Sequence, residues 1–465
     1  MTSTASTKGK RKKSPDPERF EPSAFSLKEA AKNADVLSWI SILIFGFGTF
    51  ARRQFVKGIV FLASEVAIFA FLFTIGAEYL PKIVTLGTET QHCVKVDGFP
   101  ECTAGDSSVE ILLYSVMSVA AVVLLVYVAT LSLRSAYKAQ SIVAKGKRPV
   151  NFIEDVASLF DRNAHVGLMS LPTAGIVVFS ILPLIFMISM AFTNYDSTHV
   201  PLFQWVGLTN FFKIFSTSSG AINAATFIEV LVWTLVWAFF ATFLNFFFGM
   251  FIAMIINRRT TVLKNLWRTC FSLTIAVPQF VSLLIMHSML QHDGAINRLL
   301  HSLGWIGDPL PFFEDATWAR VTVILINLWV GIPYTIMQIT GILQNVPAEL
   351  YEAAQLDGAG WWQRFMNVTM PYIFFVMTPY LITTFTGNVN NFNVIYLLSG
   401  GAPTEVGSSA GKTDLLITWL YKLTVDKDNY CMGAVIGIMT FIVLAVVALI
   451  TYRNSGSYKN EEGFR

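Results

Sequence analysis

Long apolar stretches are the feature that most constrains how this chain can fold. Eight of them approach or exceed the roughly 20 residues that a helix needs to cross about 30 Å of hydrocarbon. In a bilayer only helices and closed barrels satisfy their own backbone hydrogen bonds, and the alternating pattern of a barrel is missing. The sequence therefore predicts an all-α membrane protein with eight transmembrane helices. The predicted spans are about 57–79, 108–132, 166–192, 226–256, 267–290, 319–343, 369–392 and 428–452.

The composition agrees with a membrane protein. Of the 465 residues, 54% are hydrophobic and 14% are charged, whereas a soluble domain carries about 25% charged residues. The net charge of +3 is small. The N-terminal tail is basic, but no apolar core follows closely, so it does not have the pattern of a cleaved signal peptide. We expect a cytoplasmic tail near anionic lipid and no binding of nucleic acid. Its cations are Lys8, Lys10, Arg11, Lys12 and Lys13.

Lysine and arginine gather in alternate connections, which predicts the orientation of the chain in the membrane. The tail and the connections at 133–165 and 257–266 are rich in these residues, whereas those at 80–107, 193–225 and 291–318 hold few. Because cytoplasmic loops carry the excess of positive charge, both chain ends are expected in the cytoplasm. An even number of spans agrees with this orientation.

These features divide the chain into five parts. After the basic tail comes an N-terminal part with an interfacial segment at 36–50 and two spans. A cytoplasmic connection then leads to a block of six spans and a short cytoplasmic tail. The bounds of the five parts are 1–35, 36–132, 133–165, 166–452 and 453–465.

Four cysteines are present, and two of them share one polar connection. Cys93 and Cys102 lie in the predicted outer loop, whereas Cys270 and Cys431 lie in apolar segments. No CxxC pair exists, so we expect neither a zinc site nor a redox motif, and no metal site elsewhere. If the loop faces outward, Cys93 and Cys102 are candidates for a disulfide, and two free thiols are the alternative.

The polar connection at 344–371, between predicted spans six and seven, carries clear helix signals. Pro347 suits the first turn of a helix, two glutamates follow at its positive end, and Gly358 or Gly360 can end it. We expect a short amphipathic helix across the cytoplasmic face. Without further information, such a helix would be an ordinary connection lying on the membrane.

The same connection resembles the cytoplasmic signature of ABC importer permeases, EAA-x3-G-x9-I-x-LP. Glu352, Ala353 and Ala354 are followed after three residues by Gly358, and after nine more by the letters VTMP. The string PAELYEAAQLDGA is similar to the sugar-importer branch. The resemblance implies coupling helices that contact a separate ATPase through these four residues and Asp357. ATP and Mg would bind that partner, and this chain would be no enzyme and hold no cofactor.

The wider resemblance covers roughly 166–452 and is to the MalF type of maltose/maltodextrin membrane subunits. It implies a type I ABC importer permease core of six helices that translocates an oligosaccharide by alternating access. It also implies three partners in the bacterial cytoplasmic membrane: a second homologous permease subunit, an ABC ATPase dimer and an extracytoplasmic sugar-binding protein. One departure is the short connection at 193–225, where some members carry a large domain. The supporting strings are AFTNYD at 191–196, NLWVGIPY at 327–334, NVNNFNVIYLLSGGAP at 388–403 and TDLLITWLYKL at 413–423.

In predicted spans six and seven, candidate site residues recur at i, i+4 and i+7, which places them on shared helical faces, and span five adds one further amide. One interpretation is a sugar site inside the membrane, with Gly331 making room for the ligand. The other is bonding between helices, with glycine allowing close packing. The MalF-type resemblance favours the sugar site and adds Val330. The residues are Thr384, Asn388 and Asn391 in span seven, Asn327, Gly331 and Tyr334 in span six, and Gln279 in span five.

Two other classes of membrane protein compete with an importer. An ion-coupled carrier would need charged groups buried near mid-membrane, and the spans hold few besides Glu65. A non-transporting assembly protein would not need a loop that engages an ATPase. The string GSSAGKT at 407–413 is not a phosphate-binding loop, because three residues rather than four separate Gly407 from Gly411. Among substrates, maltodextrin is expected first, although other oligosaccharides suit the same polar path.

Overall fold

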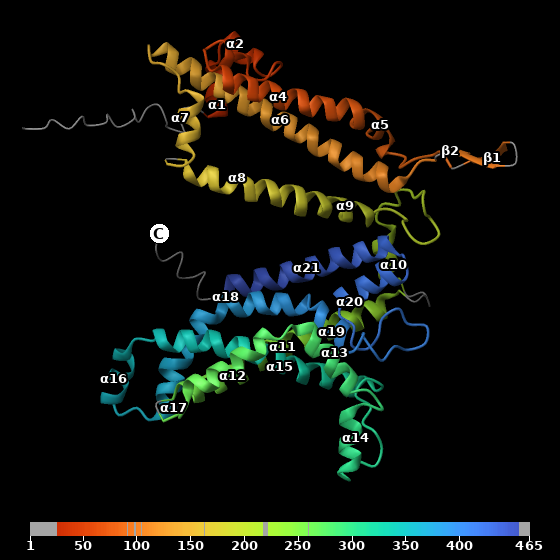
Figure 1. Cartoon of the computed structure of the whole chain (residues 1–465), viewed down its shortest axis with the longest axis vertical. Coiled ribbons are helices and arrows are strands. Elements are labelled where there is room, and N and C mark those ends of the chain that lie inside the picture. The colour runs from red at the N-terminus through yellow and green to blue at the C-terminus, as the bar shows by residue number, and fades with distance from the viewer. Residues whose placement is uncertain are drawn as a thin grey trace, which may run out of the picture. The chain divides into compact units, whose positions relative to one another are not determined.

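The computed structural model describes residues 26–454, apart from 91, 97–98, 104, 162, 217–221 and 259. The basic run at the N-terminus and most of the C-terminal tail therefore lie outside the described residues. The chain forms two compact units (Figure 1). The first is Met1–Ser189 with Pro201–Trp205, and the second is Met190–Val200 with Val206–Arg465.

The first unit is built on two long helices, α4 and α6, that lie side by side (Figure 1). After α4 a π turn, α5 and a 3₁₀ turn prolong the same span to Ile83. The elements of this unit are α1 (Leu27–Asn33), α2 (Val36–Ile40), α3 (Phe47–Phe50), α4 (Phe55–Phe71), α5 (Ala77–Tyr79), β1 (His92–Val96), β2 (Phe99–Thr103), α6 (Ser108–Ala144), α7 (Phe152–Ser158), α8 (Ala164–Ile176) and α9 (Leu182–Met190).

The predicted interfacial segment at 36–50 is folded as the short helices α2 and α3 rather than as a span. Its apolar side chains Val36 and Leu43 are 75% and 78% exposed, as expected for a segment lying on lipid. Glu65 of α4 is buried, and its Oε2 accepts a 2.7 Å hydrogen bond from the Phe45 amide. This acidic residue therefore ties the interfacial segment to the first span.

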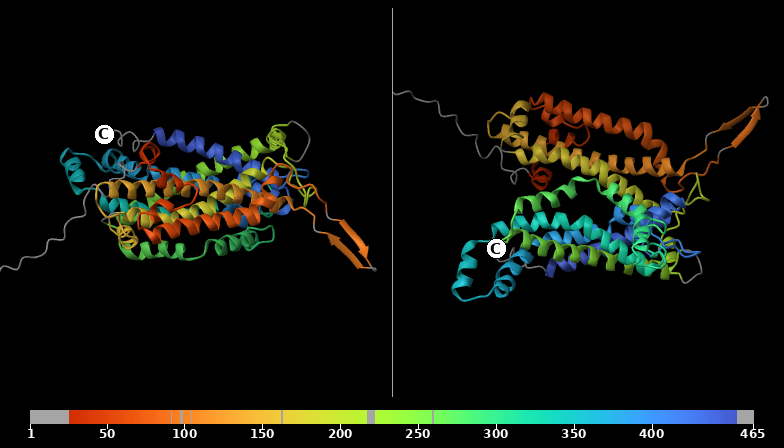
Figure 2. Two further views of the ribbon diagram at one scale, coloured as in Figure 1. Left: turned by 90° about the horizontal axis from the view of Figure 1, so that it is seen from above. Right: turned by 60° about the horizontal axis from the view of Figure 1, so that its bottom comes forward.

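The connection between the first two predicted spans contains a feature that the sequence did not predict. Strands β1 and β2 form a two-stranded antiparallel sheet within the predicted loop at 80–107. Figure 2 shows this hairpin projecting beyond the ends of α4 and α6. The fold class is thus all-α in its spans, as predicted, with a small β-hairpin outside them.

The second unit is a bundle in which α11 packs along α15 and α18, and α18 contacts α21. In Figure 1, α16 and α17 lie at one end of this bundle, and α10, α14 and α20 lie at the other. Its elements are α10 (Thr209–Ile214), α11 (Ala224–Asn257), α12 (Lys264–Ala276), α13 (Gln279–Met289), α14 (Ala295–Ser302), α15 (Ala316–Asn345), α16 (Ala348–Leu356), α17 (Trp361–Arg364), α18 (Met370–Val389), α19 (Phe392–Leu398), α20 (Leu416–Tyr421) and α21 (Tyr430–Asn454).

The number of spans agrees with the prediction. In the described residues, seven helices are long and apolar enough to cross a membrane, and the bent pair α12–α13 makes an eighth candidate. Predicted span five is therefore broken, with an 86° bend between α12 and α13. The cause is local, because Val277 is extended and Pro278 lacks the N–H that would continue the helix.

The boundary between the two compact units lies further towards the C-terminus than the connection at 133–165. The boundary falls after Ser189, so the span formed by α8 and α9 belongs to the first unit. None of the residues in the most apolar window of that span is buried. The predicted six-span block at 166–452 therefore starts with a span that lies outside the compact second unit.

Candidate functional site

A cavity of about 160 Å³ lies in the second unit, lined by residues of α11, α13, α15 and α18 and by the residue that caps α19. All eight residues predicted for substrate binding line this one cavity. They come from three predicted spans, so the helical faces inferred from spacing do converge. The eight residues are Gln279, Asn327, Val330, Gly331, Tyr334, Thr384, Asn388 and Asn391.

Six further residues complete the wall of the cavity and were missed. Those on α11 could have been found, since Thr242 and Asn245 are polar residues at i, i+3 in predicted span four. The aromatic and aliphatic members carry no such signal, because apolar side chains fill every span. The six residues are Thr242, Asn245, Phe246, Thr335, Tyr380 and Leu381.

The cavity is polar but uncharged, because its lining residues include no Asp, Glu, Lys or Arg. Within the described part of the chain, the Oδ1 of Asn245 and the Nδ2 of Asn327 are buried without a hydrogen-bond partner. The Nδ2 of Asn245 is already used, since it donates to the Ala241 carbonyl at 2.6 Å. Buried polar atoms are nearly always paired, and leaving one unpaired costs about 1–3 kcal/mol. Two residues of the cavity wall therefore each carry a buried polar atom without a partner among the described residues, an acceptor on Asn245 and a donor on Asn327.

Asn388 and Asn391 also bond within the protein. The Nδ2 of Asn388 donates to Thr242 Oγ1 at 3.0 Å and so links α18 to α11. Helix α18 ends at Val389, so Asn391 does not lie on the same helical face as predicted. Instead its Oδ1 accepts from the Val394 amide and caps α19. These two residues line the cavity while holding the turn between the two helices.

Gly331 has a different role from the one expected in a sugar site. A Cβ at this position would collide with the amide of Asn245, so the space above the glycine is filled by that side chain. The glycine thus lets α15 approach α11 closely, as in the packing interpretation. Tyr334, one turn further along, is 48% exposed and leaves its ring available at the cavity.

The predicted coupling loop folds as two short helices joined by a turn. Helix α16 follows Pro347 and ends at Leu356, and Gly358 adopts a left-handed conformation with φ +73°. This confirms the helix start and the glycine stop read from the sequence. Helix α17 begins after Gly360, whose N–H donates to the Gln363 side chain at 2.8 Å.

The residues of the resembled signature are accessible in this chain. Glu352, Ala353, Asp357 and Gly358 are exposed and Ala354 is half-buried. Helix α16 is attached to the next span by the Tyr351 hydroxyl, which lies 3.0 Å from Thr369 Oγ1. Leu356 at the end of α16 is 90% exposed, and Trp361 and Trp362 of α17 are exposed as well. A free apolar surface next to an acidic helix is suited to contact with another protein.

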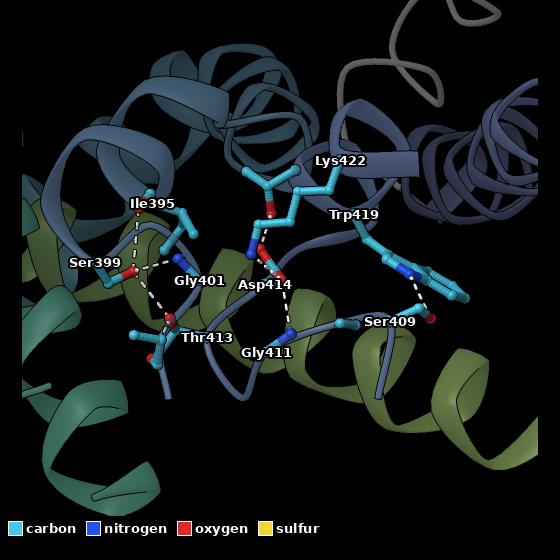
Figure 3. A network of polar contacts seen from close by, with 12 residues as sticks. Ile395, Ser399, Gly401, Ser409, Gly411, Thr413, Asp414, Trp419 and Lys422 are labelled. Atoms are coloured by element: carbon cyan, nitrogen blue, oxygen red, sulfur yellow. Dashed lines mark hydrogen bonds and ion pairs between the residues drawn. The ribbon is translucent and has the colours of Figure 1, made fainter. Parts of the chain in front are cut away.

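The connection at 399–422 is held by a buried polar network (Figure 3). The Asp414 carboxylate is fully buried and pairs with Lys422 Nζ at 2.6 Å. It also accepts from the Gly411 amide at 2.7 Å and from Thr418 Oγ1 at 2.9 Å. The Gly411 amide of the string GSSAGKT is therefore occupied within the protein, which agrees with the rejection of a phosphate-binding loop.

The four cysteines fall into two groups. Cys270 is exposed and Cys431 is buried, and both are free thiols. Cys93 and Cys102 lie in β1 and β2, where their Cα atoms are register partners. The side chains of these two cysteines lie outside the described part of the structure.

Comparison with known proteins assigns a family to this fold and cavity. Residues 245–456 match the family described as "Binding-protein-dependent transport system inner membrane component". The chain is 36% identical over 428 residues to the galactooligosaccharides transport system permease protein GanP of Bacillus subtilis (strain 168), covering 90% of this chain and 97% of that protein. It is 32% identical over 452 residues to the maltodextrin transport system permease protein MdxF of the same organism, covering 94% and 98%.

A solved structure supports the fold. A bacterial ABC transporter involved in the import of the acidic polysaccharide alginate has a chain that matches with a TM-score of 0.51 and 22% identity, covering 64% of this chain and 98% of that one. With two relatives above 30% identity over nearly the whole length, the chain belongs to the binding-protein-dependent transport permeases and is a sugar ABC importer permease of the inner membrane.

Proposed function

We propose that this chain translocates a neutral oligosaccharide, expected to be maltose or maltodextrin, into the cytoplasm by alternating access driven by a separate ATPase. The observation that carries the proposal is the uncharged polar cavity with an unused acceptor on Asn245 and an unused donor on Asn327. Sugar hydroxyls both donate and accept, so they can bond both atoms. A charged substrate would instead need a charged partner in the same place.

The lining supports a sugar by chemistry and by shape. The amides of Asn327 and Asn388 offer polar contacts, and the half-exposed ring of Tyr334 offers an apolar surface. The cavity, at about 160 Å³, is smaller than the roughly 300–1,000 Å³ of typical small-molecule sites. An oligosaccharide therefore requires another conformation with a wider path, as alternating access provides.

The proposal includes the partners and the orientation of the importer. An ABC ATPase dimer would bind ATP and Mg and contact the coupling loop at Glu352, Ala353, Ala354, Asp357 and Gly358. A second homologous permease subunit would complete the path, and an extracytoplasmic binding protein would deliver the sugar. The alginate transporter has been solved with its oligosaccharide-bound periplasmic protein, which supports that last partner by analogy. Both chain ends would lie in the cytoplasm.

Uptake measurements test the proposed function directly. Labelled maltotriose should enter cells or proteoliposomes that hold the complete transporter, and unlabelled maltodextrin should compete. Galactooligosaccharide is the second candidate, favoured by the 36% identity to GanP over 90% of the chain. A galactooligosaccharide of equal length should compete weakly if maltodextrin is the substrate and strongly if it is not. Uptake of neither sugar would contradict the proposal.

The coupling loop has its own test. Tagged wild-type chain should co-purify with an ATPase subunit in mild detergent, and Glu352→Lys should lose it, because the reversed charge disrupts the exposed face of α16. Asp308→Lys is a matched control, since it reverses an exposed charge in a predicted outer connection. If the wild-type chain brings down no ATPase, or if both variants behave alike, the coupling role of this loop is wrong.

A further inference from the structure

The pairing of β1 with β2 brings two cysteines to the same level of the hairpin. The register pairs His92 with Thr103, Cys93 with Cys102, and Val96 with Phe99. Two residues separate the strands in the sequence, and they are Asp97 and Gly98. Asp-Gly is a favoured sequence for two-residue hairpin turns. Register in a hairpin is set by loop length, so this pairing follows from the sequence as well.

The alternation of antiparallel pairs gives Cys93 and Cys102 a position suited to a disulfide. The pair that closes a two-residue turn is hydrogen-bonded, and pairs alternate from there. Lys95–Pro100 is then a non-hydrogen-bonded pair and Val94–Glu101 a hydrogen-bonded pair. Cys93–Cys102 is again a non-hydrogen-bonded pair. Pro100 agrees with this order, because proline has no N–H to contribute to a ladder.

In a non-hydrogen-bonded pair, the Cα and Cβ atoms of the two strands lie closer together than in a hydrogen-bonded pair. Their Cα atoms are about 4.5 Å apart, and a disulfide requires Cα atoms roughly 4.4–6.8 Å apart. A pair of this kind meets the distance condition for a cross-link, and the register assigns Cys93 and Cys102 to such a pair. A shift of the strand register by one residue would separate Cys93 from Cys102, so the proposed cross-link depends on this register.

The hairpin also needs a source of stability. Its sheet has only two strands, and such a hairpin is at best marginally stable in water. Its base is held by Asp106, which pairs with Lys82 Nζ at 2.7 Å and accepts from the Thr88 amide at 2.9 Å. These contacts fix the ends of the connection at the base of the hairpin.

We propose that Cys93 and Cys102 form an intramolecular disulfide across β1 and β2 on the outer side of the membrane. The thiolate of one cysteine attacks an oxidised disulfide, either of a thiol-oxidising protein or of a small disulfide, and releases one sulfur as a thiol. The second thiolate then displaces the other sulfur from this mixed disulfide. The two cysteines lose two electrons and two protons, and the reacting disulfide is reduced. The proposal relies on the orientation included under the proposed function.

Peptide mapping of the full chain tests the cross-link. Free thiols in intact cells are blocked with N-ethylmaleimide, and the purified chain is cleaved after glutamate without reduction. Glu89, Glu101 and Glu110 delimit two short peptides, which are residues 90–101 and 102–110. The expected result is one linked species that separates on reduction. Recovery of both peptides carrying N-ethylmaleimide would overturn the proposal.

Two variants and one labelling reaction sharpen the result. Cys93→Ser should leave Cys102 reactive, and Cys93→Ser/Cys102→Ser should speed tryptic cleavage after Lys95 by about tenfold or more, because a disulfide restrains the opening of the loop that it closes. After reduction, a membrane-impermeant maleimide should label both cysteines on intact cells. Absence of that labelling would place the hairpin inside and overturn the proposal, whereas sugar uptake tests the transport function separately.

Discussion

Two polar regions of the second unit differ in how their buried groups are paired. In the connection at 399–422, the buried Asp414 carboxylate has Lys422, Gly411 and Thr418 as partners. In the cavity, Asn245 Oδ1 and Asn327 Nδ2 are buried with no partner among the described residues. The buried carboxylate of the first region is thus fully paired, and the two buried amide atoms of the second region are not. Full pairing is typical of a polar group that stabilises the fold, whereas the unpaired atoms of the cavity wall are the ones that the proposed function assigns to the sugar.

The largest effect should come from breaking the complete network. Asp414→Asn keeps the size of the side chain but leaves the Lys422 charge without its partner. Removing one member of a buried ion pair costs about 3–5 kcal/mol, so the variant should unfold at clearly lower temperature in detergent. Glu405→Gln is the control, because the carboxylate is 69% exposed in its 3.0 Å pair with Lys412. That exposed pair should contribute less than about 1 kcal/mol. Equal thermal stability of the two variants would contradict the assigned difference.

A second effect tests whether Gly331 serves packing. Gly331→Ala places a Cβ against the Asn245 amide, and overpacking of this kind costs about 1–3 kcal/mol. Gly341→Ala in the same helix is the matched control, since nothing lies within 4 Å of the added Cβ. There the higher helix propensity of alanine should stabilise the chain by up to about 1 kcal/mol. Thermal unfolding of both variants measures the contrast.

A second substitution, at Asn245, tests whether the collision with its amide causes the loss of stability in Gly331→Ala. Gly331→Ala/Asn245→Ala should recover the stability that Gly331→Ala loses, because the second change removes the colliding amide. If the double variant is as unstable as the single one, the contact between α11 and α15 is not the reason. If Gly331→Ala is fully stable but blocks uptake, the glycine makes room for ligand after all.

These contrasts also show what the sequence could and could not predict. Helical spacing placed Asn327, Gly331 and Tyr334 on one face of α15, because periodicity is a local property. It could not predict that Asn245 of α11 covers Gly331, since that contact joins residues 86 positions apart in the chain. The 86° bend was likewise missed in a span that hydropathy treats as continuous, although Pro278 is the residue that causes it.

The coupling loop and the hairpin show the same limit. Proline and glycine fixed the start and end of α16 through backbone chemistry that acts within a few residues. The pairing of β1 with β2 was missed, because each strand is only five residues long and lies in a polar connection. Short strands carry little periodicity, and their pairing depends on a turn rather than on composition.

A third effect should separate binding from stability. Asn327→Leu removes an unpaired donor, so the protein should keep its thermal stability while sugar uptake at low concentration falls about tenfold, the equivalent of about 1.4 kcal/mol. Asn297→Leu is the opposite case, because its buried amide nitrogen lies within 3.1–3.3 Å of three carbonyl oxygens and its Oδ1 accepts from the Leu310 amide. That variant should lose at least about 2 kcal/mol of stability. Loss of stability in Asn327→Leu would show a structural role for the donor.

The smallest effect concerns Asp106, a paired carboxylate at the base of the hairpin. The Lys82 ammonium, together with the Thr88 and Glu89 amides, lowers the pKa of Asp106 from 3.8 to about 2 against the opposing effect of burial. Because the folded pKa lies below the ordinary one, the stabilisation is complete above about pH 4 and is lost as pH falls towards 2. Its lysine is 39% exposed, compared with 17% for Lys422, so pairing contributes less here.

Hydrogen exchange at the Thr88 and Glu89 amides can measure this contribution. Both amides donate to Asp106 Oδ2, at 2.9 and 3.1 Å. Their protection, corrected for intrinsic exchange, should stay constant between about pH 5 and 8 and fall only in stronger acid. Asp106→Asn should lower the protection across the whole range, because a neutral amide is a weaker acceptor than a carboxylate. A change in protection with a midpoint between about pH 5 and 8 would mean that a different group holds the base of the hairpin, and that Asp106 does not belong with Asp414 among the fully paired carboxylates.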